Sequence, residues 1–203
     1  MPYYKTIPTM IKHILAFASL FAVLGATQAQ SGYGAPSPAR FLFGAGLSGG
    51  GDEIAKARYT NGDNVNLHAG GLIYLTAGMD YRFTPEFALQ GTVNYHVDRA
   101  NARNGDIKFE RFPIELIAYY QPNPAWRVGG GVRYTSSPKL SGGGIASGID
   151  ASFDNTTSAV VEAEYFTSPK LGIKVRYVNE TFKTPGIGDV DGSHVGISAN
   201  FYF

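Results

Sequence analysis

The sequence lacks cysteine altogether and carries almost no net charge. Its 203 residues contain no Cys, and 17 Lys and Arg against 16 Asp and Glu leave a formal charge of +1. The absence of Cys excludes disulfides and a lipid anchor attached through cysteine. The balanced charge gives no broad basic surface, so we do not expect nucleic acid as a partner. The length suits one domain.

Long apolar runs are also missing. The apolar segment at residues 14–24 is too short to cross a bilayer as a helix. It follows Lys5 and Lys12 and precedes small residues, which predicts a cleavable signal peptide over residues 1–29. Met10 is an alternative start, and a retained membrane anchor is the less favoured alternative. An exported chain without a membrane helix can span a bilayer only as a closed barrel, because lipid satisfies no backbone hydrogen bond.

What the sequence does contain is strict alternation of apolar residues with polar or small ones, which is clearest in residues 194–203. A period of two predicts a strand with two different faces. The apolar face of this stretch consists of Val195, Ile197, Ala199, Phe201 and Phe203.

The same pattern predicts seven further strands and a flexible leader before them. The leader covers residues 30–40 and the barrel residues 41–203. The expected strands are residues 41–48, 66–83, 87–97, 108–121, 126–135, 157–167, 171–182 and 194–203. Short turns at 84–86, 122–125 and 168–170 alternate with polar loops at 49–65, 99–106, 136–156 and 181–191, which is typical of up-and-down transmembrane barrels. Pro113 cannot donate to a ladder, so we expect a bulge or irregular pairing there.

These features resemble the small outer-membrane barrels of the OmpA/OmpX-like superfamily. The chain ends on an alternating strand with Phe203, and aromatic residues mark both ends of the apolar faces. The resemblance implies an all-β fold, an eight-stranded antiparallel up-and-down transmembrane β-barrel in the cell outer membrane. It implies outer-membrane lipid and lipopolysaccharide as surroundings, and the barrel assembly machinery as a partner that reads Phe203 and Phe201. Loops on the outer side are candidates for binding an extracellular ligand.

The charged residues fall on the face opposite the apolar one, which points inward in such a barrel. They are Asp80, Arg82, Glu115, Arg127, Arg133, Glu162, Glu164, Lys174 and Arg176. Opposite charges nearly cancel, which favours a structural network over a polar conduit or ligand cavity. If each short turn is a three-residue loop, Phe83 pairs with Phe87, Pro122 with Trp126, and Thr167 with Leu171. The same register places Glu115 opposite Arg133, Glu164 opposite Lys174, and Glu162 opposite Arg176, and such cross-strand pairs are favourable.

Residues for catalysis or metal binding are not apparent. His194 and Ser198 lie on one strand, as in lipid A deacylases, but on the inward face; His68 and His96 also point inward. The spacings indicate no Ser/His/acid set, no metal cluster and no cofactor, and the acids within residues 188–192 are a weak calcium motif. The favoured function is a non-enzymatic outer-membrane barrel for envelope integrity, adhesion or surface interaction. A small-solute channel or hydrophobic-ligand carrier is the alternative, and a lipid A-modifying enzyme is less favoured.

Overall fold

The computed structural model describes residues 38–58, 64–102, 105–144, 146–148, 150–184 and 188–203. The predicted signal peptide at 1–29 and most of the predicted leader at 30–40 lie outside these residues. Within the described part of the chain, no helix is long and apolar enough to cross a membrane.

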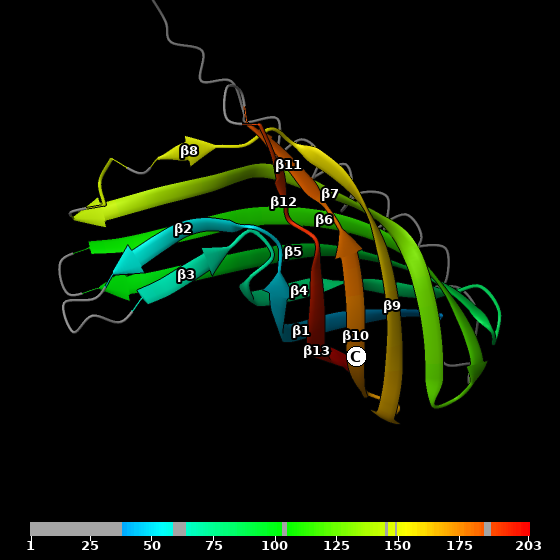
Figure 1. Ribbon diagram of the computed structural model, residues 1–203. Helices are drawn as coiled ribbons and strands as arrows, with labels where there is room; N and C mark the ends of the chain where they lie inside the picture. Colours follow the sequence, from blue (N-terminus) through cyan, green and yellow to red (C-terminus); the bar gives the residue numbers. More distant parts are fainter. Residues whose placement is uncertain (1–37, 59–63, 103–104, 145, 149, 185–187) are drawn as a thin grey trace, which may run out of the picture. The chain divides into compact units, whose positions relative to one another are not determined.

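Eight antiparallel strands close into a barrel, as the alternation predicts (Figure 1). Each strand pairs with its neighbours in the order β1–β4–β5–β6–β7–β9–β10–β13, and β13 returns to β1. Their bounds are β1 Ala39–Gly50, β4 Leu72–Arg82, β5 Phe87–Ala102, β6 Gly105–Asn123, β7 Trp126–Gly144, β9 Thr156–Ser168, β10 Leu171–Asn179 and β13 His194–Tyr202.

Five short strands lie outside this ring, where the sequence predicted loops or one continuous strand. They are β2 Glu53–Arg58, β3 Asn64–His68, β8 Ala151–Ser152, β11 Thr181–Thr184 and β12 Gly188–Asp191. The prediction of one strand over residues 66–83 was wrong: β3 pairs with β2, and only β4 joins the barrel. Gly70 lies between them, where a Cβ atom would come within 2.6 Å of the His194 Cβ and 2.7 Å of the Gly50 carbonyl oxygen. This close approach lets the chain cross against β1 and β13 before it enters the barrel.

Strands β5, β6 and β7 are longer than predicted because inward and outward side chains continue to alternate past the predicted ends. Beyond those ends the outward face becomes polar and the inward face becomes apolar. On β6 the outward side chains are Leu116 and Phe112 in the lower part, and Glu110 and Lys108 beyond Phe112. The inward side chains change the opposite way, from Glu115 to the buried Phe109. The lower part therefore has an apolar exterior, and the extension has the apolar interior of a water-soluble structure.

The inverted part forms a small domain, which we call the cap. It consists of β2, β3, β8, β11, β12 and the loop-side ends of β5, β6 and β7. Its buried core is Leu67, Ala69, Ile107, Phe109, Leu140 and Phe182. The ring of Phe109 meets those of Phe153 and Phe182 edge to face, at centroid distances of 5.6 and 5.8 Å.

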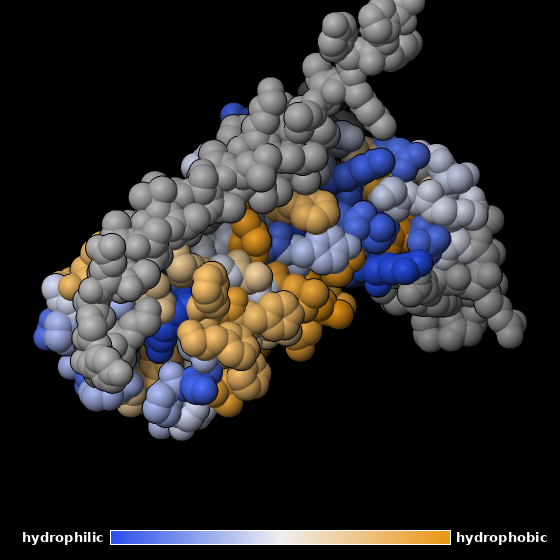
Figure 2. Space-filling model, turned by 180° about the vertical axis from the view of Figure 1, so that it is seen from behind, coloured by the Kyte–Doolittle hydropathy of each residue, from blue (hydrophilic) through white to orange (hydrophobic). Residues whose placement is uncertain are grey.

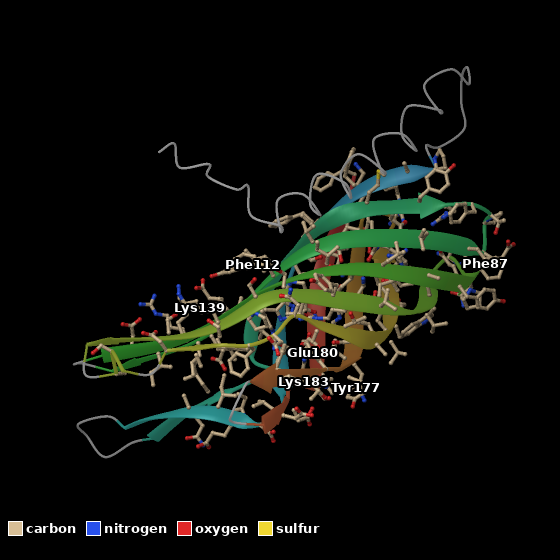
Figure 3. All side chains as sticks on the ribbon, turned by 90° about the horizontal axis from the view of Figure 1, so that it is seen from above. Phe87, Phe112, Lys139, Tyr177, Glu180 and Lys183 are labelled. Atoms are coloured by element: carbon tan, nitrogen blue, oxygen red, sulfur yellow. The ribbon has the colours of Figure 1, made fainter. Side chains whose placement is uncertain are left out.

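The exterior of the barrel is an apolar band between two aromatic rims. At the short-turn rim the ring centroids of Phe87 and Tyr120 are 5.3 Å apart, and at the other rim those of Tyr95 and Phe112 are 5.1 Å apart. The rise from Phe87 to Tyr95 is about 20 Å at about 3.3 Å per residue and a tilt of about 40°. Figure 2 shows hydrophobic side chains gathered along the middle of one face with hydrophilic residues on either side. Figure 3 shows Phe112 between Phe87 and Lys139.

The register of the strands matches the predicted one, although two hairpin ends differ. Arg82 pairs with Ala88, Tyr120 with Val128, and Phe166 with Gly172, as the three-residue turns require. At the turns themselves, Asn123 rather than Pro122 pairs with Trp126, and Ser168 rather than Thr167 pairs with Leu171. A local register shift in each hairpin absorbs the extra residue, so the strands above remain in the predicted register.

Irregular pairing does occur around Pro113. The ladder of β5 and β6 is interrupted between Val93–Ile114 and His96–Arg111, and the register of β6 and β7 shifts between Glu110 and Phe112. On β7 this shift includes Ser137, which has a left-handed backbone with φ 47°. The bulge lies at the level where the polarity of the strands inverts.

Candidate functional site

The candidate site is the interior of the barrel, which is filled by ionised side chains. We call these residues the lumen network. None is more than 6% exposed, and they lie on the inward faces of β4, β6, β7, β9 and β10 and at the single residue between β10 and β11. The members are Asp80, Arg111, Glu115, Arg127, Arg133, Glu162, Glu164, Lys174, Arg176 and Glu180.

Arg127 organises the short-turn end of the network. Its guanidinium lies 2.6 Å from the Asp80 carboxylate and 2.7 Å from Glu164, and it donates to the Tyr202 hydroxyl at 2.6 Å. It also lies over the ring of Tyr119, 3.8 Å from the centroid, a cation–π arrangement. One arginine on β7 thus contacts four other strands around the lumen.

Glu115 and Glu162 organise the middle of the network. Glu115 lies 3.0 Å from Arg133 and 2.7 Å from Arg176, and Glu162 lies 2.8 Å from Lys174 and 3.3 Å from Arg176. Arg176 therefore joins β10 to β6 across the interior and does not pair only with its strand neighbour. The cross-strand neighbours Lys174 and Glu164 are 3.9 Å apart, because the ammonium turns towards Glu162.

Glu180 organises the end of the network nearest the cap. Its carboxylate accepts from Thr135 and, at 3.3 Å, from Ser158, and it lies 3.4 Å from Arg133 and 3.7 Å from Arg111. Arg111 in turn donates to the Ala69 carbonyl, between β3 and β4. Figure 3 shows Glu180 near the junction of barrel and cap. This group lies between the lumen and the cap core.

Burial dictates this pairing. Removing a charge from water costs several kcal/mol unless an opposite charge and hydrogen bonds replace the water. Every member of the lumen network lies within 4 Å of an opposite charge. The mutual pairing of acids and bases leaves no lining of one sign that would select an ion.

The structure does not bring all predicted site residues together, and it adds two. Arg82 lies outside the lumen network, at the short-turn mouth, where it donates to Gln121 at 3.1 Å. Arg111 and Glu180 were not among the predicted site residues. The alternation could have indicated both residues. Arg111 is an even number of residues from Glu115 on β6, and Glu180 an even number from Lys174 and Arg176, so each falls on the inward face.

The histidines serve the interior packing. His194 directs Nδ1 to the Gly192 carbonyl oxygen at 2.7 Å, and His96 stacks on Tyr74 at 4.8 Å. His68, which is half-buried, directs its Nδ1 to the Gly51 carbonyl oxygen at 3.2 Å. Among the described residues, no group of His, Asp and Glu has the arrangement of a metal site.

The acidic segment around β12 is held by its own neighbours. The Ser193 hydroxyl and backbone N–H bind the Asp191 carboxylate and lower its pKa below the ordinary value. The backbone N–H of Asp191 donates to the Asp52 carboxylate at 2.9 Å. These bonds tie β12 to the chain between β1 and β2.

The closed ring of strands, the apolar band with two aromatic rims and the charged interior define a transmembrane β-barrel. Barrels of this construction span bacterial outer membranes. The chain belongs to the outer membrane protein beta-barrel domain family, whose model matches residues 15–203. The protein is therefore an outer-membrane barrel of the small eight-stranded kind.

Solved structures of small outer-membrane barrels share the fold. Ail, the attachment invasion locus protein of Yersinia pestis, is 12% identical, with a TM-score of 0.52 over 83% of this chain and 100% of that one. Ail in complex with the heparin analogue sucrose octasulfate is 14% identical, with a TM-score of 0.51 over 81% and 97%. Neisserial surface protein A is 14% identical, with a TM-score of 0.49 over 82% and 98%. No curated protein matches the sequence.

Proposed function

We propose that this protein is a non-enzymatic outer-membrane barrel whose lumen is closed to solutes and whose cap carries its interactions at the cell surface. The observation that carries the proposal is the lumen network, in which buried acids and bases neutralise one another across the whole interior. The envelope role follows from the barrel itself, and the surface role from the cap.

The closed lumen is supported by the connections that cross it. Arg127 contacts Asp80 and Glu164, and Arg176 contacts Glu115 and Glu162. An ion passing through would have to separate such pairs in a medium of low dielectric constant, where their attraction is strong. An eight-stranded barrel is also only wide enough for side chains to fill its interior.

The surface role is supported by the construction of the cap. Its core residues are at most 4% exposed, so it is a packed unit rather than a set of separate loops. Its outer side carries Arg99, Lys108 and Lys139, and Lys139 is exposed and forms no ion pair with another described residue. A packed cap with outward charges offers a preformed surface, which limits the ordering cost of binding a partner. Ail has been solved with a heparin analogue, and a polyanion is therefore a suitable first probe.

Planar bilayer recording of the refolded protein tests the closed lumen. We expect no stepwise current from the wild type at neutral pH. The control is Arg176→Ala with Arg127→Ala, which removes both lumen-crossing arginines and should produce measurable current if it folds, as judged by its heat-modifiable migration in gels. Regular wild-type steps at low protein concentration would contradict the closed lumen and favour a small-solute channel.

Binding of whole cells to immobilised heparin tests the surface role. Wild-type cells should bind more than cells without the protein, and Lys139→Glu should reduce that binding. The matched control is Lys170→Glu, an exposed lysine in the turn at the opposite end of the barrel, which should have no effect. Equal binding with and without the protein would exclude polyanions as its surface partners.

A further inference from the structure

The short-turn end of the lumen opens into a cavity of about 670 Å³. The ends of the three short hairpins form it, and it lies outside the closed part of the lumen network. Pockets for small organic molecules are of this size and are mostly apolar with a few convergent polar groups. The cavity has this composition: its walls include Phe166 and four prolines, and Arg40, Arg82 and Gln121 supply polar groups.

The arginines at this cavity differ in whether an acid holds them. Arg40 lies 2.7 Å from Asp80, which also holds Arg127 at 2.6 Å. Arg127 has Glu164 as its second acid, while Arg82 forms no ion pair within the part of the chain that the structure describes. Arg40 and Arg127 are thus paired with Asp80 and Glu164, which leaves the guanidinium of Arg82 without a bound carboxylate.

The N-terminal part of the sequence does not supply the missing acid. The first acidic residue of the whole chain is Asp52, so the residues before Arg40 contain neither Asp nor Glu. Glu86 is the acid on the cavity wall, and its carboxylate accepts from the Thr84 hydroxyl at 3.1 Å within its own turn. With Asp80 and Glu164 engaged by other arginines and Glu86 held within its own turn, the guanidinium of Arg82 is available to an anion from outside the chain.

The guanidinium of Arg82 is held in position. Its NH2 donates to Gln121 Oε1 at 3.1 Å, and Gln121 Nε2 donates to the Pro124 carbonyl at 3.4 Å. A guanidinium has five donors in a planar fork, so this single bond leaves donors for a ligand. The fork matches a carboxylate, which it binds through two parallel hydrogen bonds.

We propose that this cavity binds a small organic carboxylate, with the carboxylate on Arg82 and the apolar body of the ligand against Phe166 and the proline-rich wall. Gln121 acts as the positioning residue for Arg82. This site lies at the opposite end of the barrel from the cap, and its ligand differs from the polyanion proposed for the cap surface.

NMR titration of the refolded protein in micelles tests the proposal, with benzoate as the probe and neutral benzamide as its matched control. Benzoate should shift the Nε–Hε signal of Arg82 saturably, and benzamide should not. Arg82→Gln should weaken benzoate binding at least tenfold, and Glu86→Gln should strengthen it several-fold by removing a like charge. Arg99→Gln, an exposed arginine at the cap end, should bind as the wild type does.

The outcomes separate binding at Arg82 from other causes of a signal change. Equal shifts with benzamide would assign the effect to apolar partitioning and overturn the carboxylate site. Unchanged benzoate affinity in Arg82→Gln, or a response that grows linearly without saturation, would overturn it too. The Arg82 signal of the wild type gives an answer even if the variant fails to refold.

Discussion

At the scale of single residues, Glu115 shows how the barrel tolerates charge in its interior. It is 3% exposed and holds two guanidinium groups, those of Arg133 and Arg176. Removing one partner of a buried ion pair is costly because the other charge remains without water, whereas removing both is much less costly. The stability that Glu115, Arg133 and Arg176 each contribute therefore depends on the presence of the others.

Glu115→Ala and Arg133→Ala measure this dependence. Each single change should lower the free energy of unfolding by about 3 kcal/mol, the lower end for a broken buried pair, because the charges left behind keep a second partner. In Glu115→Ala, Arg133 keeps Glu180; in Arg133→Ala, Glu115 keeps Arg176. The double variant should lose at least about 1 kcal/mol less than the sum of the single losses. Urea unfolding in lipid vesicles supplies the measurement, and strict additivity would show that the two side chains do not interact.

At the scale of elements, β6 joins a lipid-facing surface to a cap core on one continuous strand. Phe109 and Phe112 are three residues apart but point to opposite sides, with exposed fractions of 1% and 41%. The first packs on Phe153 and Phe182, and the second faces outward at the rim beside Tyr95. The same residue type thus serves two environments.

Phe109→Ala should open the cap and leave the barrel intact. It removes a buried ring, a change that costs about 3–5 kcal/mol in a packed core. Brief proteolysis of the refolded protein should then cleave in the β2–β3 hairpin while the barrel resists. Phe112→Ala is the matched control and should retain wild-type resistance. Identical cleavage of the two variants would mean that the cap has no cooperative core.

The segment at residues 141–147 should face outward and accept an epitope. Its first four residues are the cap end of β7 and 145–147 lie beyond the strand. All but Ile145 are Ser, Gly or Ala, and an insertion after Gly144 should be tolerated because few contacts are lost at the end of a strand. An antibody should therefore label intact cells. Labelling only after the outer membrane is permeabilised would reverse the orientation of the barrel.

Much of the barrel follows from alternation and turn length, since these two features place Glu115 opposite Arg133 before any coordinates are known. The cap does not follow, because a search for apolar outward faces ends at Phe112, where β6 leaves the apolar band. The break between β3 and β4 depends on the close approach of Gly70 to Gly50 and His194, a tertiary contact without a local signal. The lumen-crossing contacts of Arg176 depend on barrel closure, which cross-strand register alone does not describe.

At the scale of the whole molecule, assembly and stability make different demands on the closing strand. Phe203 is 73% exposed, and its backbone N–H donates to the Phe41 carbonyl at 2.9 Å. Its side chain is a minor part of the packing, and one such hydrogen bond contributes about 1 kcal/mol. The finished barrel therefore depends little on this residue, and we propose that its role lies in the signal read during assembly.

Deleting Phe203 should consequently slow assembly far more than it destabilises the folded barrel. In cells, the amount of heat-modifiable protein in the outer membrane should fall several-fold, while protein refolded in vesicles should lose only about 1 kcal/mol of stability. Phe43→Ala is the matched control, because Phe43 faces outward, pairs with Phe201 and is 52% exposed, yet lies outside the last strand. It should assemble at the normal rate. If both variants assemble equally well, the terminal aromatic is one more lipid-facing side chain, and recognition of this chain resides elsewhere.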